Sequence, residues 1–204
     1  MEELGTWRKE IDRIDEEILR LLNERLGIAQ KIGELKKASG LEIHVPERER
    51  EIFERLMKLN KELYGGKFPE EALFHIYREI ISACLAVEKP LRVAYLGPKA
   101  TFTHQAALEY FGFSVHYLPV STIRDVFNEV DLCRADYGVV PVENTIEGVV
   151  NYTLDMFLEY DLKIVGEVVI PIRLHLLSNL PSLESVKRIY SHRHALAQCR
   201  TWID

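Results

Sequence analysis

The chain has 204 residues, of which 47% are apolar and 28% charged, a composition that is ordinary for a soluble globular protein of one or two domains. Its formal net charge of −6 argues against general nucleic-acid binding, which usually needs a basic face. The three cysteines are far apart and form no C-x-x-C pair, which argues against a disulfide framework or a zinc ribbon.

The sequence shows neither a signal peptide nor a membrane-spanning segment. The first ten residues, MEELGTWRKE, are charged and lack the apolar region of a signal peptide. The longest apolar run, IISACLAV, is too short to cross a bilayer. We therefore expect a cytoplasmic protein with no membrane partner.

Charge density changes along the chain and marks a domain boundary. Residues 1–89 carry 35 charged side chains, whereas the longer stretch 90–204 carries 23, and the sequence EKP stands at the junction. The first domain, 1–89, has helical periodicity throughout, and the second, 90–204, alternates between strand and helix patterns.

The first predicted helix covers about residues 5–38. Its length of roughly 50 Å at 1.5 Å per residue is too great for a compact monomer of this size, so we expect a partner helix and a dimer. Its seam, counted in steps of three and four, has one charged member, Arg25. The seam positions are Trp7, Ile11, Ile14, Ile18, Leu21, Arg25, Ile28, Ile32 and Leu35.

Two further helices are expected in the first domain. One opens at Pro46, where proline suits a first turn, and ends at the glycines 65–66. The other opens at Pro69 and ends before Pro90.

Further charged side chains are expected on the buried sides of these helices. Lys36 follows Arg25 by eleven residues and so lies about 20° away on the same face. Arg48 and Glu49 lean toward the stripe of the second helix, and Glu88 follows Cys84 by one turn of the third.

Two interpretations of this charged set remain open. The residues can be internal ion pairs that set helix register, which is the usual role of a single charged seam residue. The inward cations outnumber the nearby acids, however, and buried unpaired charge is costly, so we favour a site for a small dianion between the helices.

The same residues carry a resemblance. The segments WRKEIDRIDEEILRLLNERLGIAQKIGELKK, VPEREREIFERL and REIISACLAVE resemble the all-helical chorismate mutases, and most of all the mutase domain of bifunctional chorismate mutase–prephenate dehydratases. The resemblance implies an intertwined homodimer that rearranges chorismate to prephenate without metal or cofactor. Its implied site residues are Arg8, Arg25, Lys36, Arg48, Glu49 and Glu88.

The roles are implied by the resemblance as well. Arg25 and the partner subunit's Arg8 would hold the two carboxylates, with Arg48 in support. Lys36 and Glu88 would face the ether oxygen of the breaking bond, and Glu49 the ring hydroxyl.

Two positions depart from the family pattern. Val45 stands where some relatives have an aspartate, so hydroxyl recognition would depend on Glu49 alone. Glu88 stands where some relatives have glutamine, and a carboxyl group donates a hydrogen bond only when it is protonated.

The second domain reads as alternating strands and helices, which is typical of a mostly parallel sheet flanked by helices. The expected strands are 91–97, 114–120, 137–142, 163–178 and 186–191. The expected helices are 101–112, 122–133, 145–160 and 194–203.

This domain resembles the opening part of the prephenate dehydratases, which implies a two-lobed, periplasmic-binding-protein-like α/β fold. RVAYLGPKATFTHQAAL resembles that family's first turn and helix, ADYGVVPVENTIEGVV its central signature, and YSHRHALAQCRTWI a later segment. Ala100 stands where glycine is usual. The candidate prephenate-binding residues are Thr101, Phe102, Glu143, Asn144, Thr145, Ser191 and His192. For any one of these turn residues, helix capping is the simpler interpretation.

Two further features of the second domain concern metal binding and dehydratase activity. The pair His192 and His194 has no further well-spaced ligand, so we expect no metal site. The chain ends before the later Thr-Arg-Phe motif of the family, so we expect a truncated domain, little or no dehydratase activity and poor anchoring of the last 40 or so residues.

The leading interpretation is therefore a chorismate mutase joined to an incomplete dehydratase domain in phenylalanine biosynthesis, with chorismate and prephenate as ligands. The alternative is a helical dimerisation module, without catalysis, attached to a small-molecule-binding α/β domain.

Overall fold

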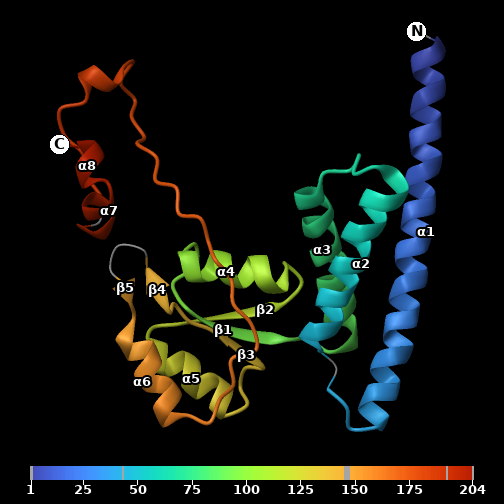
Figure 1. Cartoon of the computed structure of the whole chain (residues 1–204), viewed down its shortest axis with the longest axis horizontal. Coiled ribbons are helices and arrows are strands. Elements are labelled where there is room, and N and C mark those ends of the chain that lie inside the picture. Colours follow the sequence, from blue (N-terminus) through green and yellow to red (C-terminus); the bar gives the residue numbers. More distant parts are fainter. Residues whose placement is uncertain (1, 43, 145–147, 192, 204) are drawn as a thin grey trace.

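Three helices form the first half of the chain, as the sequence predicts (Figure 1). They are α1 (Glu2–Ala38), α2 (Pro46–Tyr64) and α3 (Glu70–Glu88). The computed structural model describes residues 2–42, 44–144, 148–191 and 193–203. Within those ranges, no helix is both long enough and apolar enough to cross a membrane.

The turn between α2 and α3 follows from local chemistry. Gly65 has φ of 63°, in the left-handed region that glycine adopts without steric cost, and its N–H caps α2 by donating to the carbonyl of Asn60. The buried Asn60 side chain in turn donates to the carbonyl of Phe68, 2.8 Å away. The glycine pair thus ends α2 where the sequence predicts.

The second half is built on a three-stranded parallel sheet, which confirms the expected strand–helix alternation in this part of the chain. Its elements are β1 (Arg92–Leu96), α4 (Phe102–Phe111), β2 (His116–Val120), α5 (Ile123–Asp131) and β3 (Tyr137–Val139). The strand order is β2-β1-β3, so β1 is central and is covered on both faces.

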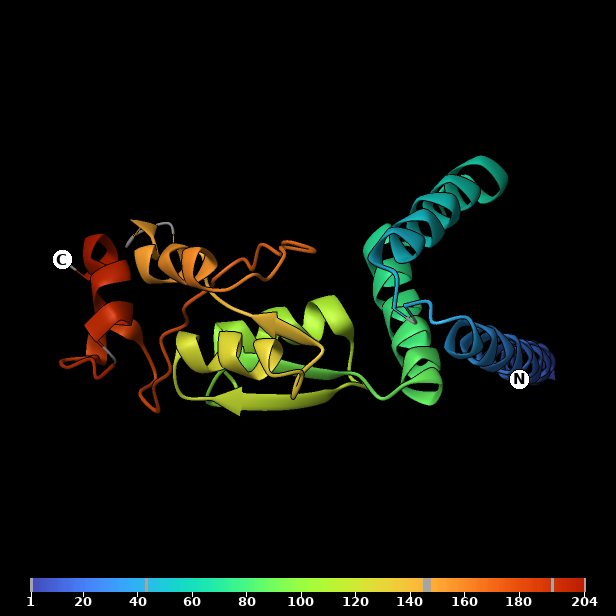
Figure 2. The same ribbon diagram turned by 90° about the horizontal axis from the view of Figure 1, so that it is seen from below.

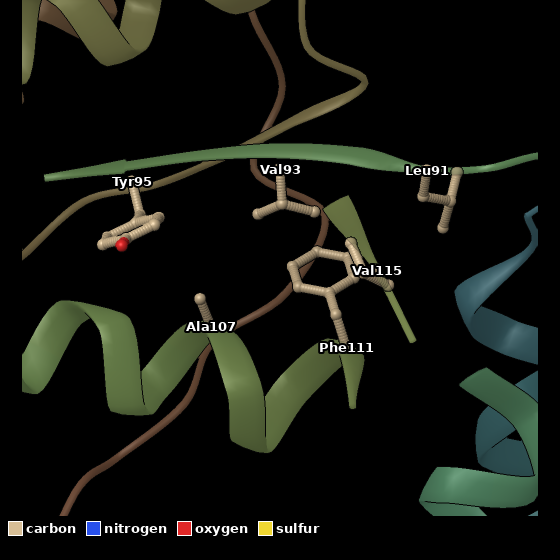
Figure 3. Close-up of a cluster of buried hydrophobic side chains, with 6 residues drawn as sticks. All are labelled: Leu91, Val93, Tyr95, Ala107, Phe111 and Val115. Atoms are coloured by element: carbon tan, nitrogen blue, oxygen red, sulfur yellow. The ribbon is translucent and has the colours of Figure 1, made fainter. Parts of the chain in front are cut away.

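The two faces of β1 form two apolar clusters. Val93 and Tyr95 point toward α4, where they meet Ala107 and Phe111 (Figure 3). Ala94 points the other way, toward α5. Because successive strand residues alternate between faces, this central strand is buried on both sides, and its residues are apolar in sequence.

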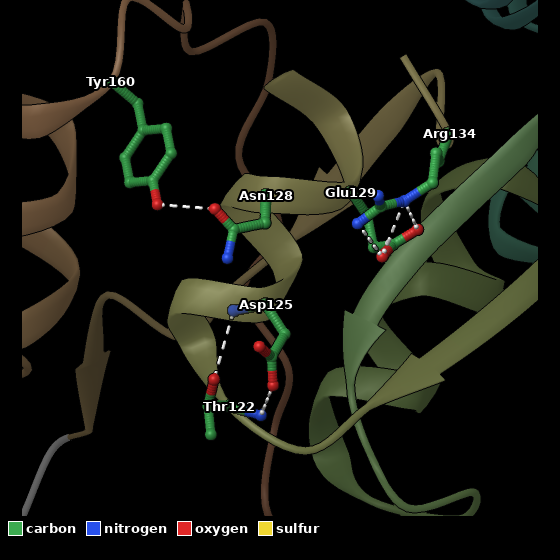
Figure 4. Close-up of polar contacts among 6 residues, drawn as sticks. All are labelled: Thr122, Asp125, Asn128, Glu129, Arg134 and Tyr160. Carbon is green, nitrogen blue, oxygen red and sulfur yellow. Dashed lines mark hydrogen bonds and ion pairs between the residues drawn. The ribbon is translucent and has the colours of Figure 1, made fainter. Parts of the chain in front are cut away.

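Helix α5 is fixed at its start and along its length by polar contacts (Figure 4). Thr122 and Asp125 form a capping box, with hydrogen bonds of 3.1 Å in each direction. The hydroxyl of Tyr160 donates to Asn128 at 2.7 Å and ties the end of α6 (Asn151–Glu159) to α5.

The remainder of the chain departs from the sequence-based expectation. The helix expected over 145–160 begins at Asn151, because β4 (Glu143–Asn144) and β5 (Gly148–Val149) form a short antiparallel pair before it. Residues 161–178 form no strand, and neither do residues 186–191, so the strands expected over 163–178 and 186–191 are wrong.

The physical reason is the lack of a paired strand among the described residues for these apolar segments. Val169 is 78% exposed and Leu177 89% exposed, so neither lies in a core in this chain. A 3₁₀ turn (Leu183–Ser185) follows, and the helix expected over 194–203 is divided into α7 (Arg193–Gln198) and α8 (Arg200–Ile203).

Helix α3 lies between the other two helices and the sheet half (Figure 2). The side chains of Glu79 and Ser82 accept hydrogen bonds from the backbone N–H groups of Phe113 and Ser114, at 3.0 and 3.2 Å. A Cβ on Gly112 would lie 2.6 Å from the Cβ of Ser82, so glycine permits this close approach. The two halves are therefore in direct contact through α3.

Candidate active site

The seam arginine of α1 faces α3. Arg25 is half-buried, and its NH1 group donates to the Sγ of Cys84 at 2.8 Å. Cys84 itself is buried, with 6% of its surface exposed. A guanidinium has five N–H donors in a planar fork, so a single bond to sulfur leaves donors for a bidentate carboxylate.

Glu88 lies one turn further along α3 and also faces α1. Burial raises the pKa of its carboxyl above the ordinary value, while the nearby Lys36 and Arg25, and then Lys37, act in the opposite direction. The Nζ of Lys37 donates to the backbone carbonyl of Glu88 at 2.7 Å and fixes the end of α3 against α1. Arg25, Lys36 and Glu88 therefore form one group between two helices.

Two of the expected site residues lie apart from that group. Arg8 is exposed and precedes Arg25 by 17 residues, which is about 25 Å along one helix. Arg48 is exposed and forms an ion pair with Glu51 on its own helix at 2.7 Å. The expected inward lean of Arg48 is not present in the single chain.

Glu49 belongs to a second polar cluster, at the contact between the two halves of the chain. Its Oε1 pairs with the Nε2 of His44 at 2.9 Å, and its Oε2 accepts from the NH1 of Arg78 at 2.6 Å. The Nδ1 of His44 lies 2.7 Å from the hydroxyl of Tyr137 on β3. The second half of the chain thus reaches Glu49 through His44.

Chemistry fixes one hydrogen-bond direction in this cluster. Burial raises the pKa of Tyr137 to about 12, so its hydroxyl stays protonated at neutral pH. A carboxylate can only accept, so the Nε2–H of His44 donates to Glu49, while the hydroxyl of Tyr137 lies within hydrogen-bond distance of Nδ1 on the other side of the same ring.

Arg78 completes this cluster and lies over aromatic rings. Its guanidinium carbon is 4.9 Å from the ring centre of Phe53 and 5.3 Å from that of Phe74. Arg78 is six residues before Cys84, so it lies about 120° around α3 from the face that meets Arg25. The Glu49 cluster and the Arg25 group therefore occupy different faces of α3.

His44 and Arg78 were missed by sequence reasoning. Arg78 falls beside the apolar stripe of α3 and not within it, and His44 stands in the short connection before Pro46. The position of Arg78 one turn after Phe74 was a usable signal, because residues four apart share a helix face.

We predict that Arg78→Met lowers the free energy of unfolding by about 2–4 kcal/mol, because it leaves the Glu49 carboxylate, 13% exposed, without its cation. Methionine keeps the apolar stem over the rings. Urea unfolding of the full chain measures the change. The matched control, Arg13→Met, removes an exposed pair with Glu10 and should cost less than about 1 kcal/mol. Equal effects of the two variants would contradict a stabilising role for the buried pair.

The expected prephenate-binding residues of the second half are only partly described. Thr101 caps α4: its Oγ1 accepts from the N–H of His104 at 3.3 Å and donates to the carbonyl of Pro98 at 3.0 Å. Phe102 is about half-exposed. Glu143 is exposed on β4, and Ser191 is exposed near the end of the chain.

The remaining members fall wholly or partly outside the described residues. Thr145 and His192 lie outside them, and the side chain of Asn144 is not described. Among the described residues, no hydrogen bond joins Thr101 or Phe102 to Glu143. A shallow hollow lies at the carboxyl ends of β1 and β2, the edge where parallel sheets usually bind ligands, and it is lined by Gly97, Pro98, Pro119, Val120 and Ser121.

The first turn of this half contains a strained residue. Ala100 has φ of 67°, in the left-handed region that costs a residue with a Cβ about 1–2 kcal/mol. Its N–H donates to the Nδ1 of His104 at 3.2 Å. The structure thus explains why glycine suits position 100, and a single side-chain hydrogen bond supports the alanine.

Each half of the chain matches a known protein family. A family model described as "Prephenate dehydratase" matches residues 93–204, and one described as "Chorismate mutase type II" matches residues 7–89. A bifunctional chorismate mutase/prephenate dehydratase of Aquifex aeolicus (strain VF5) is 74% identical over 204 residues, which is 100% of this chain and 56% of that protein.

Less similar relatives have the same description. Proteins with the same description from Stutzerimonas stutzeri and Escherichia coli (strain K12) are 46% and 31% identical, over 100% and 97% of this chain and 56% and 55% of theirs. An X-ray structure of prephenate dehydratase from Streptococcus mutans is 37% identical, covers 40% of this chain and 43% of that one, and has a TM-score of 0.39. The chain spans about half the length of the curated relatives it matches.

Proposed function

The chain belongs to the prephenate dehydratase family, with a chorismate mutase type II segment before it, and we propose from this that its helical half rearranges chorismate to prephenate. We propose residues 1–89 as the mutase domain and residues 90–204 as part of a dehydratase domain. The pathway would be phenylalanine biosynthesis in the cytoplasm.

The observation that supports the mutase most directly is the group of Arg25, Lys36 and Glu88 between α1 and α3. Two cations and one partly buried carboxyl converge there from two helices. The rearrangement breaks one bond and forms another within a single molecule, so it needs no nucleophile. It needs a fixed substrate conformer and positive charge or hydrogen-bond donors where the ether oxygen becomes negative.

The proposed roles follow that requirement. Arg25 holds one carboxylate through the donors that Cys84 leaves available. Lys36 and protonated Glu88 donate to the ether oxygen, which becomes more basic as the bond breaks. These interactions are stronger in the transition state than in the ground state, which is the condition for raising kcat.

A second subunit would complete the site. The seam of α1 is exposed in the single chain: Trp7 is 61% exposed, Ile11 57% and Ile18 50%. So long an apolar stripe is covered in stable proteins, and a second copy of α1 fits it by its matching pattern. Such a homodimer would bring Arg8 of the partner subunit to Arg25.

Arg48 and Glu49 remain proposed ligands in this dimer. The exposed side chain of Arg48 is free to turn from Glu51 toward a substrate carboxylate, at small cost for a surface pair. Glu49 would exchange contacts with His44 and Arg78 for the ring hydroxyl, or use the acceptor positions that these contacts leave.

For the second half we propose prephenate as the ligand. The N-terminus of α4, at Thr101 and Phe102, offers backbone N–H groups to an anion. Glu143, Asn144 and Thr145, together with Ser191 and His192, are proposed to face the same ligand.

Glu88 gives the proposal a pH signature. Its raised pKa keeps the protonated, hydrogen-bond-donating form to a higher pH than an exposed glutamate would have. We predict that turnover is highest in mildly acidic solution and falls as pH rises through this pKa. Glutamine donates at every pH, so Glu88→Gln should remove the decline.

The measurement is kcat between about pH 5 and pH 8 for both proteins, with Glu34→Gln on the exposed face of α1 as the control. Glu34→Gln should keep the wild-type profile. An unchanged decline in Glu88→Gln would remove Glu88 from the proposed role.

The direct test of the function is the loss of chorismate followed by ultraviolet absorbance, with prephenate identified as the product. Wild-type protein should convert chorismate well above the uncatalysed rate. Absence of any such rate would overturn the mutase assignment.

One observation favours the alternative function, a helical dimerisation module without catalysis. Glu49 is paired on both oxygens in the single chain, as a purely structural residue would be. The same assay decides between the two functions, because a dimerisation module would form the dimer and leave chorismate unchanged.

A further inference from the structure

Helix α1 contains three glycines, and one of them has a special environment. A Cβ added to Gly5 or Gly27 would meet nothing within 4 Å. A Cβ added to Gly33 would lie 3.1 Å from the Cγ of Glu88 and 3.2 Å from both its Cβ and its Oε2. Gly33 is also buried, whereas the other two are not.

Glycine inside a helix has a cost that alanine does not have. The difference is about 0.5–1 kcal/mol for each interior position. Gly33 therefore needs a reason, and its contacts give one. The Glu88 side chain crosses the backbone of α1 at this position, where any other residue would place atoms.

The consequence concerns the group of Arg25, Lys36 and Glu88. The end of α3 is held on α1 by the bond from Lys37 to the carbonyl of Glu88, and one turn earlier by the bond from Arg25 to Cys84. Position 33 of α1 lies between Arg25 and Lys37, opposite the Glu88 side chain. The size of the residue at position 33 therefore determines how closely the Glu88 carboxyl approaches α1.

We propose that Gly33 is a positioning residue for Glu88: the missing side chain forms a notch in α1 that lets the Glu88 carboxyl lie close to Lys36 and Arg25. This inference rests on the proposed mutase function. Residue 33 makes no contact with substrate in this proposal and acts through Glu88.

The size of the expected effect follows from the distances. The Cγ and Oε2 of Glu88 can rotate away from a new methyl group, but its Cβ can move only with the backbone of α3. The shift needed is a few tenths of an ångström. Since a misplacement of 1 Å can cost about 100-fold in rate, we expect Gly33→Ala to lower kcat by about threefold to tenfold.

The matched control is Gly27→Ala in the same helix. Both substitutions replace an interior glycine with a better helix former, so neither should weaken α1 itself. Gly33→Ala should lower kcat with a smaller change in KM, and Gly27→Ala should leave both near the wild-type values. Equal losses in the two variants would overturn the proposal, because they would reflect the helix backbone and not the notch.

A double-mutant cycle separates positioning from general damage. In a Glu88→Ala background there is no carboxyl to displace, so Gly33→Ala should add no further loss of kcat. A further loss of threefold or more in that background would contradict the proposal.

A readout without turnover keeps the test independent of the proposed function. In Gly33→Ala the Glu88 carboxyl moves toward solvent, so its titration, followed by NMR of carboxyl-labelled glutamate, should shift toward the ordinary value. The charged groups that act on this carboxyl are Lys36, Arg25 and Lys37, and none of them is substituted in this variant. The titration should not move in Gly27→Ala. If wild-type protein fails to convert chorismate, the function fails, while this titration still supports or overturns the notch.

Discussion

Replacing Arg25 with alanine is expected to lower kcat/KM for chorismate by about a thousandfold, because it removes the half-buried guanidinium that we propose to donate two hydrogen bonds to a substrate carboxylate. Arg25 is the cation that α3 holds in place through Cys84, and Glu88 lies in the same group. A loss of this size corresponds to about 4 kcal/mol of transition-state stabilisation.

The form of the loss is informative. Arg25→Lys keeps the positive charge but has no planar fork, so we expect it to retain less than about a tenth of the wild-type kcat/KM. The control Arg13→Ala removes an exposed arginine paired with Glu10 and should keep the wild-type kcat/KM. Circular dichroism melting of each variant shows whether the fold is intact. A kcat/KM for Arg25→Ala within tenfold of wild type would contradict a site centred on this residue.

The helical half could be predicted from sequence because its signals are local. Heptad spacing indicates α1, proline indicates the start of α2, and Gly65 indicates its end, and all three agree with the structure. Helix starts and ends depend on a few neighbouring residues, which sequence patterns report directly.

The end of the α/β half could not be predicted in the same way. The alternating pattern at residues 163–178 is typical of a strand, yet a strand exists only when a neighbour accepts its backbone hydrogen bonds. The three-stranded sheet offers none to that segment, so it forms no strand and is mostly exposed. Strand propensity depends on context more than helix propensity does.

The candidate site divides along the same line. Arg25, Lys36 and Glu88 came together as their helical spacing predicts, since residues on one face of a long helix keep their relative positions. Glu49 lies apart from them. The apolar stripe of α2 shows which face of the helix is buried, but it does not show how α2 packs on α3, and that packing determines where the Glu49 side chain points. The ion pair with Arg78, buried among aromatic rings, determines where Glu49 lies in this chain.

The proposed dimer makes a second prediction of large size. If each site takes Arg25 from one chain and Arg8 from the other, Arg8→Ala and Arg25→Ala should each be nearly inactive alone. A mixed dimer of the two variants is different. One of its sites contains both substitutions, and the other contains neither, because the intact Arg25 of one chain meets the intact Arg8 of its partner.

Mixing the two variants in equal amounts, after unfolding and refolding together, should therefore restore about a quarter of the wild-type activity: half of the dimers are mixed and half of their sites are intact. The control mixes Arg25→Ala with Lys36→Ala. Both residues lie on the same side of one site in the same chain, so both sites of every mixed dimer keep one substitution and activity should stay low. Recovery in the first mixture and not in the second requires that Arg8 act across the dimer. Equal recovery in both, or none in either, would contradict a site shared between subunits and leave the 25 Å between Arg8 and Arg25 along α1 without a functional purpose.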